Sequence, residues 1–411
     1  MRILYVSQYF PPEMGAPAAR VYELSREWAA LGHHVTVLTG FPHHPTGVVP
    51  AEYRGEWLRR EDVDGIHVIR APIFAAPNRG LVRRSASYLS YAASASLLGP
   101  WLSGRPDVVI ATSPQMLTAV AGAWLARWKR VPFVFEVRDL WPRSIVEVGA
   151  MRANHPVIRA LEQLELQLYR MAARVVVVTD SFVDELAERG VPRSKLRVVK
   201  NGVDLKLFHP APRENSVRVE LGLRPQDFMC LYVGTHGMAH GLTTVLDAAV
   251  KLRDNPFIRF VFVGEGAEKT KLKERARELE LTQVTFVDKQ SRVRIQEFLA
   301  ASDVSLVLLR DRPLFRTVLP SKIFEILGAG RPLILGVEGE AKAVVEAAGA
   351  GIAIPPEDSK ALVAAIEALQ RDPQRGHDMG RRGRAFVETN FSRPVLAARY
   401  LEVLREVVGR A

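Results

Sequence analysis

The chain has 411 residues, of which 48% are hydrophobic, and its formal net charge is +11 at pH 7. This size suffices for two domains of about 200 residues, each with its own core. The single cysteine, Cys230, excludes an internal disulfide and is compatible with a reducing compartment. We expect it to be a small residue of the core. The positive charge is spread over both halves without a basic tail or a nucleic-acid motif, so it favours diphosphate ligands and an anionic membrane face over nucleic acid.

A βαβ unit is predicted at the start of the chain. Residues 1–7 form an apolar strand, and the helix that follows carries Val21, Leu24 and Trp28 on one face. Residues 32–40 return as a second strand. The turn before the helix is where such a unit brings its backbone close to a ligand. The opening strand is too short for a signal peptide, so we expect none.

A proline-bounded loop at residues 41–47 carries His43 and His44. Two histidines without a carboxylate at ligand spacing are poor evidence for a metal site. The loop is therefore expected either to be solvated or to contact a substrate.

Residues 85–104 contain no charged side chain, but they are too rich in serine for a convincing membrane-spanning helix. Two interpretations remain. The segment is a long helix packed in the first domain, or it is an interfacial helix on a membrane. In the second case arginines would contact the lipid headgroups and apolar side chains would face the bilayer. These would be Arg83 and Arg84 on the headgroups, and Tyr88, Leu89, Tyr91, Leu98 and Trp101 towards the bilayer.

Charged residues follow a predicted buried strand at residues 131–137, at the strand end where open α/β sheets bind ligands. Glu136, Arg138 and Asp139 are expected to form a cluster there. Asp139 is the candidate for contacting a sugar hydroxyl, and Arg138 for pairing with Asp139 or with a phosphate. The alternative is a structural ion pair at a domain corner.

The second half repeats the pattern of apolar strand, glycine-rich turn and helix. A strand over residues 228–234 leads through a turn at 235–241, which contains His236 and His240, into a helix over 242–252. The next strand, at 260–263, leads into a second glycine-rich turn that ends at Lys269, and further strands are predicted at 284–287, 304–309 and 351–355. A terminal amphipathic helix is predicted over residues 394–410.

The stretch from residue 316 to 336 is predicted to be a loop, a helix and a buried strand. Pro320 suits the first helical turn, and the hydroxyl of Ser321 is expected to cap it. The start of this helix would direct unpaired N–H groups at an anion, with Lys322 beside them. Glu325, one turn further on, is placed to accept hydrogen bonds from ribose hydroxyls.

The motif Pro320-Ser-Lys-Ile-Phe-Glu325, followed by Gly-Arg-Pro-Leu-Ile, resembles the donor-nucleotide motif of glycosyltransferase family 4. The likeness is to the branch that assembles O-antigen, colanic-acid and capsular polysaccharides, including N-acetylfucosamine and fucose transferases. It implies the α/β GT-B fold, with two facing Rossmann-like domains, and sugar transfer with retention of anomeric configuration. The family usually has two glutamates eight residues apart, and Thr317 stands at the first of these positions.

The same resemblance assigns roles to other positions. Gly15 corresponds to the glycine that approaches the donor phosphates from the first domain, and Asn201-Gly-Val-Asp matches the segment where we place the hinge. Relatives carry Arg or Lys where this chain has His236 and His240, so phosphate binding is expected to weaken at high pH. The residues expected to bind the nucleotide sugar are Gly15, Gly234, His236, His240, Lys269, Val287, Leu319, Ser321, Lys322 and Glu325.

The resemblance predicts three segments: an acceptor-binding domain over residues 1–203, a nucleotide-sugar-binding domain over 204–392, and a terminal helix over 393–411 that packs back on the first domain. The expected activity is metal-independent transfer of a hexose from a nucleotide diphosphate sugar, with UDP expected, to a lipid-linked polysaccharide precursor. Asp139, Arg138, Lys322 and Glu325 are the candidate catalytic residues. No cofactor, metal or nucleic acid is expected.

The enzyme would lie in the cytoplasm, in peripheral contact with the inner face of the membrane. Two alternatives stay open. A sugar-nucleotide epimerase would share the fold and the donor pocket but would need acid and base groups around the sugar. An inactive nucleotide-sugar-binding subunit would bind the donor without turnover.

Overall fold

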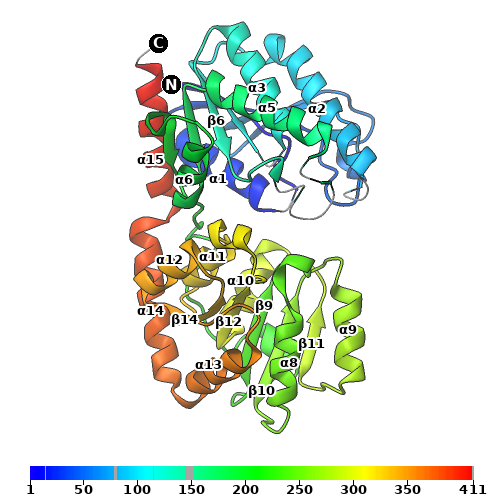
Figure 1. Cartoon of the computed structure of the whole chain (residues 1–411), viewed down its shortest axis with the longest axis vertical. Helices are drawn as coiled ribbons and strands as arrows, with labels where there is room; N and C mark the ends of the chain where they lie inside the picture. Colours follow the sequence, from blue (N-terminus) through cyan, green and yellow to red (C-terminus); the bar gives the residue numbers. More distant parts are fainter. Residues whose placement is uncertain are drawn as a thin grey trace. The chain divides into compact units, whose positions relative to one another are not determined.

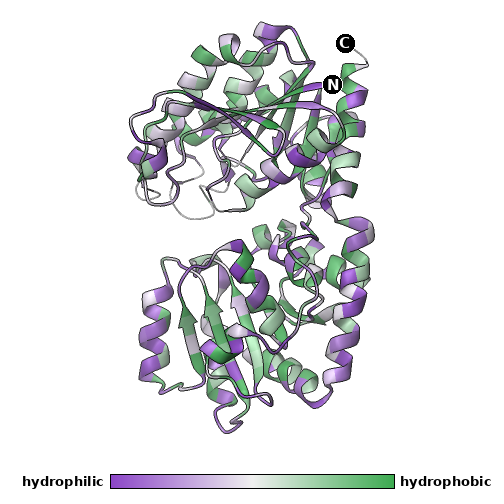
Figure 2. Cartoon of the chain, turned by 180° about the vertical axis from the view of Figure 1, so that it is seen from behind, coloured by the Kyte–Doolittle hydropathy of each residue, from purple (hydrophilic) through white to green (hydrophobic). Residues whose placement is uncertain are grey.

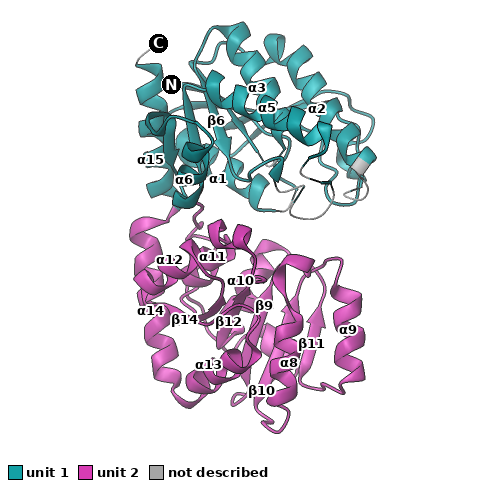
Figure 3. Ribbon diagram, viewed as in Figure 1, with its two compact units in different colours: residues 1–200, 393–411 teal, residues 201–392 magenta. Residues whose placement is uncertain are grey.

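The computed structural model describes residues 1–13, 15–77, 81–113, 115–143, 146, 151–152 and 154–409. It contains two compact units, which we call unit 1 (Met1–Lys200 with Arg393–Ala411) and unit 2 (Asn201–Ser392), coloured separately in Figure 3. Each unit is built on its own sheet with helices packed against it (Figure 1). The predicted α/β architecture with two Rossmann-like halves is confirmed.

The described part of unit 1 has an eight-stranded sheet in the order β3-β4-β2-β1-β5-β6-β7-β8. All neighbours are parallel except β3 and β4, and β1 lies in register with β2 through the pair Tyr5 and Val37. The strands are β1 (Arg2–Val6), β2 (His34–Gly40), β3 (Arg59–Val63), β4 (Ile66–Ala71), β5 (Val108–Thr112), β6 (Phe133–Val137), β7 (Arg174–Val177) and β8 (Leu196–Val198).

The helices of unit 1 cover both faces of this sheet. They are α1 (Ala16–Ala30), α2 (Leu81–Leu102), α3 (Met116–Lys129), α5 (Pro156–Met171), α6 (Asp180–Glu188) and α15 (Arg393–Val408). Alternate residues of β1 point to opposite faces, as the two-residue period of a strand requires. Leu4 joins a core with α2 and α3, whereas Tyr5 joins a core with α1 and α15.

The terminal helix α15 packs against α1 within unit 1. The ring of Trp28 lies 5.9 Å from that of Tyr5 and 5.3 Å from that of Tyr400, and its Nε1 donates to the Ala397 carbonyl at 3.0 Å. Residues from the two ends of the chain therefore share one core.

Unit 2 has a parallel sheet, six-stranded in the described residues, in the order β11-β10-β9-β12-β13-β14. The strands are β9 (Phe228–Val233), β10 (Ile258–Val263), β11 (Val284–Val287), β12 (Val304–Leu308), β13 (Leu333–Gly336) and β14 (Gly351–Ala353). The helices are α7 (Ser216–Glu220), α8 (Thr243–Lys251), α9 (Lys269–Glu278), α10 (Arg292–Ala301), α11 (Lys322–Gly328), α12 (Glu340–Ala348), α13 (Ser359–Arg371) and α14 (Pro373–Asn390). Figure 2 shows hydrophobic strands inside this unit, whereas α9 at its edge is mostly hydrophilic.

The uncharged segment after residue 84 forms α2, and its predicted orientation on a membrane is wrong in part. Tyr91 is fully buried, and its hydroxyl donates to the Leu38 carbonyl at 2.8 Å, so it belongs to the core. Leu98 is half-buried, while Leu89 and Trp101 are exposed. Across the described residues, no helix combines the length and the apolar character that crossing a membrane requires.

Candidate functional site

The candidate residues of unit 2 gather at the carboxyl ends of its parallel strands, where β9, β10 and β11 run into loops. The turn after β9 and the turn after β10 touch through their backbones. A Cβ added at Gly264 would lie 2.0 Å from the Gly234 carbonyl oxygen, and one added at Gly266 would lie 2.3 Å from that of His236. Glycine is therefore required at both positions by close packing of the two turns.

Lys322, the first residue of α11, lies beside these turns with its ammonium buried. Its Nζ sits 4.3 Å from the centre of the Tyr232 ring, and a Cβ added at Gly234 would lie 2.6 Å from it. Nζ has no hydrogen-bond partner among the described residues. Burial lowers the pKa of Lys322 to about 8, against a weaker opposing effect of Glu325. A buried cation without a hydrogen-bond partner is typical of an anion-binding site.

The helix start itself contributes less than the sequence suggests. α11 has seven residues, and the side chain of Ser321 makes no capping hydrogen bond, so the predicted Ser cap is wrong. Ser321 has right-handed helical backbone angles, whereas a capping serine is usually extended. Leu319, just before it, is a buried core residue.

His236 and His240 follow β9 as predicted, but they are not cationic at neutral pH. Burial lowers both pKa values to about 4, with a smaller effect from neighbouring lysines. His236 is fully buried, and neither of its ring nitrogens has a hydrogen-bond partner among the described residues. His240 Nδ1 lies 3.4 Å from the Leu308 carbonyl. Desolvation therefore favours the neutral form of both histidines, and their contact with phosphate stays a prediction.

Lys269 is held by two carboxylates. Its Nζ lies 2.6 Å from Glu265 and 2.6 Å from Asp288, and the side chain is largely buried. Burial lowers its pKa, but hydrogen bonds to the two carboxylates outweigh that effect and raise it. In this conformation the lysine bridges the loops after β10 and β11, and Val287 lies half-buried at the end of β11.

Glu325 lies on α11 and is partly exposed, at 27% of its side chain. Its Oε1 is 3.7 Å from Nη2 of Arg292, whose guanidinium lies over the Phe208 ring. Glu325 and Lys322 both line a cavity of about 10 Å³, which is room for about one water molecule. Thr317, at the position of the missing glutamate, donates its hydroxyl to the Leu314 carbonyl at 2.8 Å.

The candidate residues of unit 1 line a cavity of about 220 Å³ at the carboxyl ends of β1 and β6. The structure brings Gly15, His44 and Asp139 to this cavity, together with residues for which the sequence predicted no role at a substrate site. The lining consists of Tyr9, Glu13, Gly15, Pro17, Ala18, His44, Arg84, Tyr88, Asp139 and Trp141. Arg84 and Tyr88 therefore belong to a cavity wall, a position that neither interpretation of the segment predicted.

Aromatic rings and a buried acid shape this cavity. The Tyr9 and His44 rings are 5.3 Å apart, and those of Tyr88 and Trp141 are 6.4 Å apart. Glu13 accepts hydrogen bonds from the backbone N–H groups of His43 and His44 at 3.0 and 2.9 Å. Burial raises the pKa of Glu13, although these hydrogen bonds oppose the shift. His43 and His44 are thus fixed at the cavity, while Pro45 and Thr46 of the same loop are exposed.

Arg138 is a second poorly compensated buried cation. Its Nη2 donates to the Ala16 carbonyl at 3.1 Å, while Nε and Nη1 have no hydrogen-bond partner among the described residues. Burial lowers its pKa to about 10, with Glu136 acting in the opposite direction. Glu136 itself pairs with Arg20 at 2.9 Å, a partner that the predicted cluster of Glu136, Arg138 and Asp139 did not include.

Comparison with known proteins identifies the activity. Residues 15–202 match the family described as glycosyl transferase 4-like domain, and residues 214–386 match glycosyl transferases group 1. The chain is a glycosyltransferase. It is 27% identical over 376 residues to the Escherichia coli K12 protein named "Putative colanic acid biosynthesis glycosyl transferase WcaI", covering 89% of this chain and 91% of that one.

Solved structures support the fold. Sucrose-phosphate synthase from Thermosynechococcus elongatus superposes with a TM-score of 0.76 at 20% identity, covering all of both chains. Anabaena Alr3699/HepE in complex with UDP and glucose superposes with a TM-score of 0.73 at 19% identity, covering 98% of this chain and 99% of that one. The GT-B fold class predicted from the sequence is confirmed.

Proposed function

We propose that this glycosyltransferase moves a hexose, with retention, from a UDP-sugar to a lipid-linked polysaccharide precursor at the cytoplasmic face of a membrane, without a metal ion. The observation that carries the proposal is the buried ammonium of Lys322 at the glycine-rich turns of unit 2, which has no hydrogen-bond partner among the described residues. A diphosphate leaving group supplies the missing negative charge. The UDP and glucose bound in the Anabaena structure and the colanic-acid role in the name of the E. coli relative support the choice of donor and acceptor.

In the proposed reaction the bond between the sugar C1 and the diphosphate oxygen breaks, and its electron pair stays on the diphosphate. The acceptor hydroxyl oxygen bonds to C1 on the same face, and its proton passes to the departing diphosphate. Lys322 stabilises the negative charge that develops on the leaving group. Glu325 accepts hydrogen bonds from ribose hydroxyls through its exposed side. In unit 1, Asp139 holds a sugar hydroxyl and Arg138 contributes positive charge.

The aromatic cavity of unit 1 supports a glycan acceptor. Sugar rings pack their C–H faces on aromatic side chains, and Tyr9, Tyr88 and Trp141 provide such faces. Arg84 at the same cavity offers a cation for a phosphate on a lipid-linked acceptor.

Transfer should be detected by mass spectrometry when UDP- and GDP-sugars are screened against polyprenyl-diphosphate-linked acceptors in the presence of EDTA. A glycosylated acceptor would establish metal-independent transfer and name the donor. A donor that is converted without an acceptor would instead indicate an epimerase. Nucleotide binding with every donor left intact would indicate a binding subunit.

Substituting Glu325 with glutamine should lower kcat/KM for the donor by about 10–100-fold, because hydrogen bonds to a charged group are worth about 1.5–3 kcal/mol. The loss should appear mainly as a higher donor KM. Glu338→Gln is the matched control, because Glu338 is a partly exposed carboxylate that pairs with Lys342. Equal kinetics for both variants would show that Glu325 does not contact the donor.

The affinity for UDP should fall as the pH rises above about 8. The free protein has a Lys322 pKa of about 8, and a bound diphosphate favours its charged form. Binding above this pH therefore requires uptake of a proton, and the dissociation constant should increase by up to about tenfold per pH unit. Calorimetric titration between pH 7 and 10 measures this. An affinity that instead declines between pH 4 and 6 and stays flat above 7 would assign the phosphate contact to the histidines.

A further inference from the structure

Two helices of unit 1 expose large apolar side chains on adjoining surfaces. On α2, Leu97 and Trp101 are one helical turn apart and are 71% and 78% exposed. On α3, Trp124 and Trp128 are likewise one turn apart and about half exposed. The Trp128 ring lies 5.8 Å from that of Trp124 and 6.4 Å from that of Trp101. We call Leu97, Trp101, Trp124 and Trp128 the tryptophan patch.

This patch is unusual for the chain. It holds three of the six tryptophans, whereas Trp28 is fully buried in the core. Contiguous exposed aromatic surface on a folded domain marks an interaction site. The fold does not require the exposure, because α2 already buries Tyr91 and Ala95 on its inward side.

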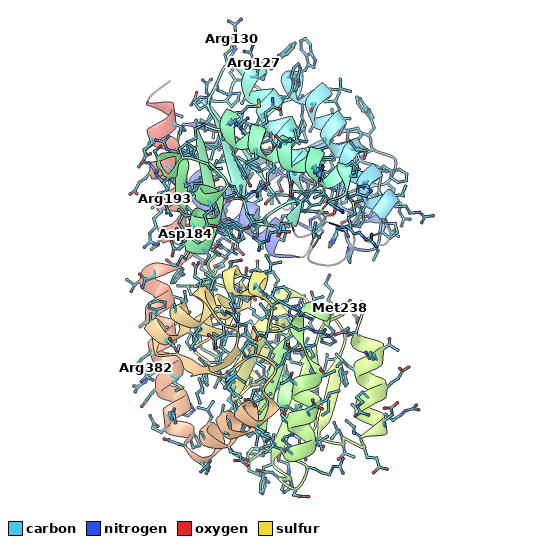
Figure 4. The ribbon with its side chains drawn as sticks, viewed as in Figure 1. Arg127, Arg130, Asp184, Arg193, Met238 and Arg382 are labelled. Atoms are coloured by element: carbon cyan, nitrogen blue, oxygen red, sulfur yellow. The ribbon has the colours of Figure 1, made fainter. Side chains whose placement is uncertain are left out.

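Three arginines lie close to the patch residues in the sequence. Arg127 lies in the last turn of α3 and Arg130 directly follows that helix (both are labelled in Figure 4), and Arg105 follows α2. None of the three has a carboxylate partner among the described residues. Arg127 and Arg130 line an open cavity of about 420 Å³, whose third arginine, Arg174, is paired with Glu406.

The segment of the sequence that contains the patch is rich in basic residues. Residues 65–135 hold eight arginine or lysine residues and a single acidic residue, Asp107, which pairs with Arg2 at 2.7 Å. Lys129 has a structural role. Its Nζ donates hydrogen bonds to the Pro100 and Gly104 carbonyls and so connects α3 to the end of α2. Arg105, Arg127 and Arg130 are therefore available to bind an anionic partner.

We propose that the tryptophan patch and Arg105, Arg127 and Arg130 dock unit 1 on an anionic phospholipid surface. Tryptophan rings favour the headgroup region of a bilayer, and arginines beside them contact lipid phosphates. The inference rests on the proposed lipid-linked acceptor and names the surface through which the enzyme reaches it. α2 runs from the acceptor cavity, lined by Arg84 and Tyr88, to the patch at Trp101, a distance of about 25 Å along the helix.

Co-sedimentation of the full chain with vesicles tests the apolar part of the surface. We expect binding to 3:1 phosphatidylcholine–phosphatidylglycerol vesicles and about tenfold weaker partitioning for Trp101→Ser/Trp128→Ser. Trp57→Ser/Phe257→Ser is the matched control, because both side chains are well exposed and neither belongs to the patch. Failure of the wild-type chain to bind, or equal partitioning of the patch variant, would overturn the proposal.

A second pair of variants tests the charge. Arg127→Glu/Arg130→Glu should abolish the preference for anionic vesicles over pure phosphatidylcholine, with at least a tenfold loss on the anionic ones. Lys271→Glu/Arg277→Glu on α9 makes the same change in net charge at exposed positions of unit 2. Equal losses in both variants would show that only overall charge matters and would reject a defined docking surface.

Turnover separates this inference from the proposed function. With a short-chain, water-soluble acceptor the patch variants should match the wild-type chain, whereas with a long-chain acceptor in vesicles they should be slower. If the wild-type chain binds vesicles but transfers to neither acceptor, the proposed function fails and the docking surface stands. If the wild-type chain dimerises in sedimentation velocity through the patch and ignores vesicles, the surface is an interface between copies instead.

Discussion

Substituting Lys322 with methionine is expected to lower kcat/KM for the donor by about 10²–10³-fold and, at the same time, to stabilise the fold. The loss of activity follows because a preorganised donor to a developing oxyanion contributes about that factor. The gain in stability follows because the buried ammonium lacks a hydrogen-bond partner among the described residues. Its pKa is lowered from 10.5 to about 8, which corresponds to about 3 kcal/mol of unfolding free energy.

The pH dependence of stability checks this account. Below pH 8 both the folded and the unfolded chain hold the Lys322 proton, and the fold carries the full cost of burying the charge. Between about pH 8 and 10.5 the unfolded state binds more protons, so the wild-type chain gains stability as the pH rises. The advantage of Lys322→Met in urea unfolding should therefore be largest at pH 7 and vanish above pH 10.5.

Lys342→Met is the control for this variant. Lys342 lies near the surface and pairs with Glu338 at 3.3 Å, so its loss should change stability by less than about 1 kcal/mol and leave the donor kinetics intact. A Lys322→Met protein that is less stable than the wild-type chain would show that the ammonium has a compensating partner. A Lys322→Met protein with full activity would show that the donor diphosphate does not bind at Lys322.

The fold could be predicted because its strands are continuous apolar runs. Residues such as Val175–Val177 are buried on both faces of a parallel sheet, so they lack polar alternation and stand out between polar helices. The orientation of α2 was harder to predict. Its inner face contains serine and alanine, which gives almost no apolar period, and Tyr91 would lie on the wrong side if the helix were interfacial.

The position of the candidate site could be predicted from the strand ends and the glycine-rich turns. The charge states of its residues could not, because they depend on contacts between segments that are distant in the sequence. The environment of Lys322 is set by Tyr232 and Gly234 from another strand, and the partner Asp288 of Lys269 comes from a third. Burial makes His236 neutral, and no local sequence signal reveals that burial. The signal that was available but overlooked is the four-residue spacing of Arg84 and Tyr88, which places both on one helical face.

The largest loss of stability in unit 1 is expected from Arg20→Met. Arg20 and Glu136 are both fully buried and lie 2.9 Å apart, and the remaining nitrogens of Arg20 donate to the Val199 and Lys200 carbonyls at 2.8 Å. Tyr5 donates to the other oxygen of Glu136 at 2.7 Å. Removing one member of a buried pair leaves the other uncompensated, which costs about 3–5 kcal/mol. Urea unfolding at pH 7 measures the change.

Two further variants distinguish this pair from a surface contact. Arg193→Met breaks the exposed pair with Asp184, labelled in Figure 4, and should cost at most about 1 kcal/mol. Arg20→Met/Glu136→Met should recover most of the lost stability, because a well-packed apolar pair replaces both charges.

At acidic pH the difference in unfolding free energy between the wild-type chain and Arg20→Met should become smaller. In the wild-type fold burial raises the pKa of Glu136, but the charges of Arg20 and Arg138 outweigh it and the net shift is downward. The pair therefore stabilises the fold above the unfolded pKa of about 4.3, and this contribution is lost as the pH falls through the lower folded value. Without Arg20, Glu136 loses its largest compensating charge, so its pKa should rise and it should take up a proton at a higher pH. Protonation removes the unpaired buried charge and so reduces the loss of stability in the variant. If the difference in unfolding free energy were the same at pH 7 and at pH 4, Arg20 would stabilise the fold through its contacts with the backbone carbonyls and not through Glu136.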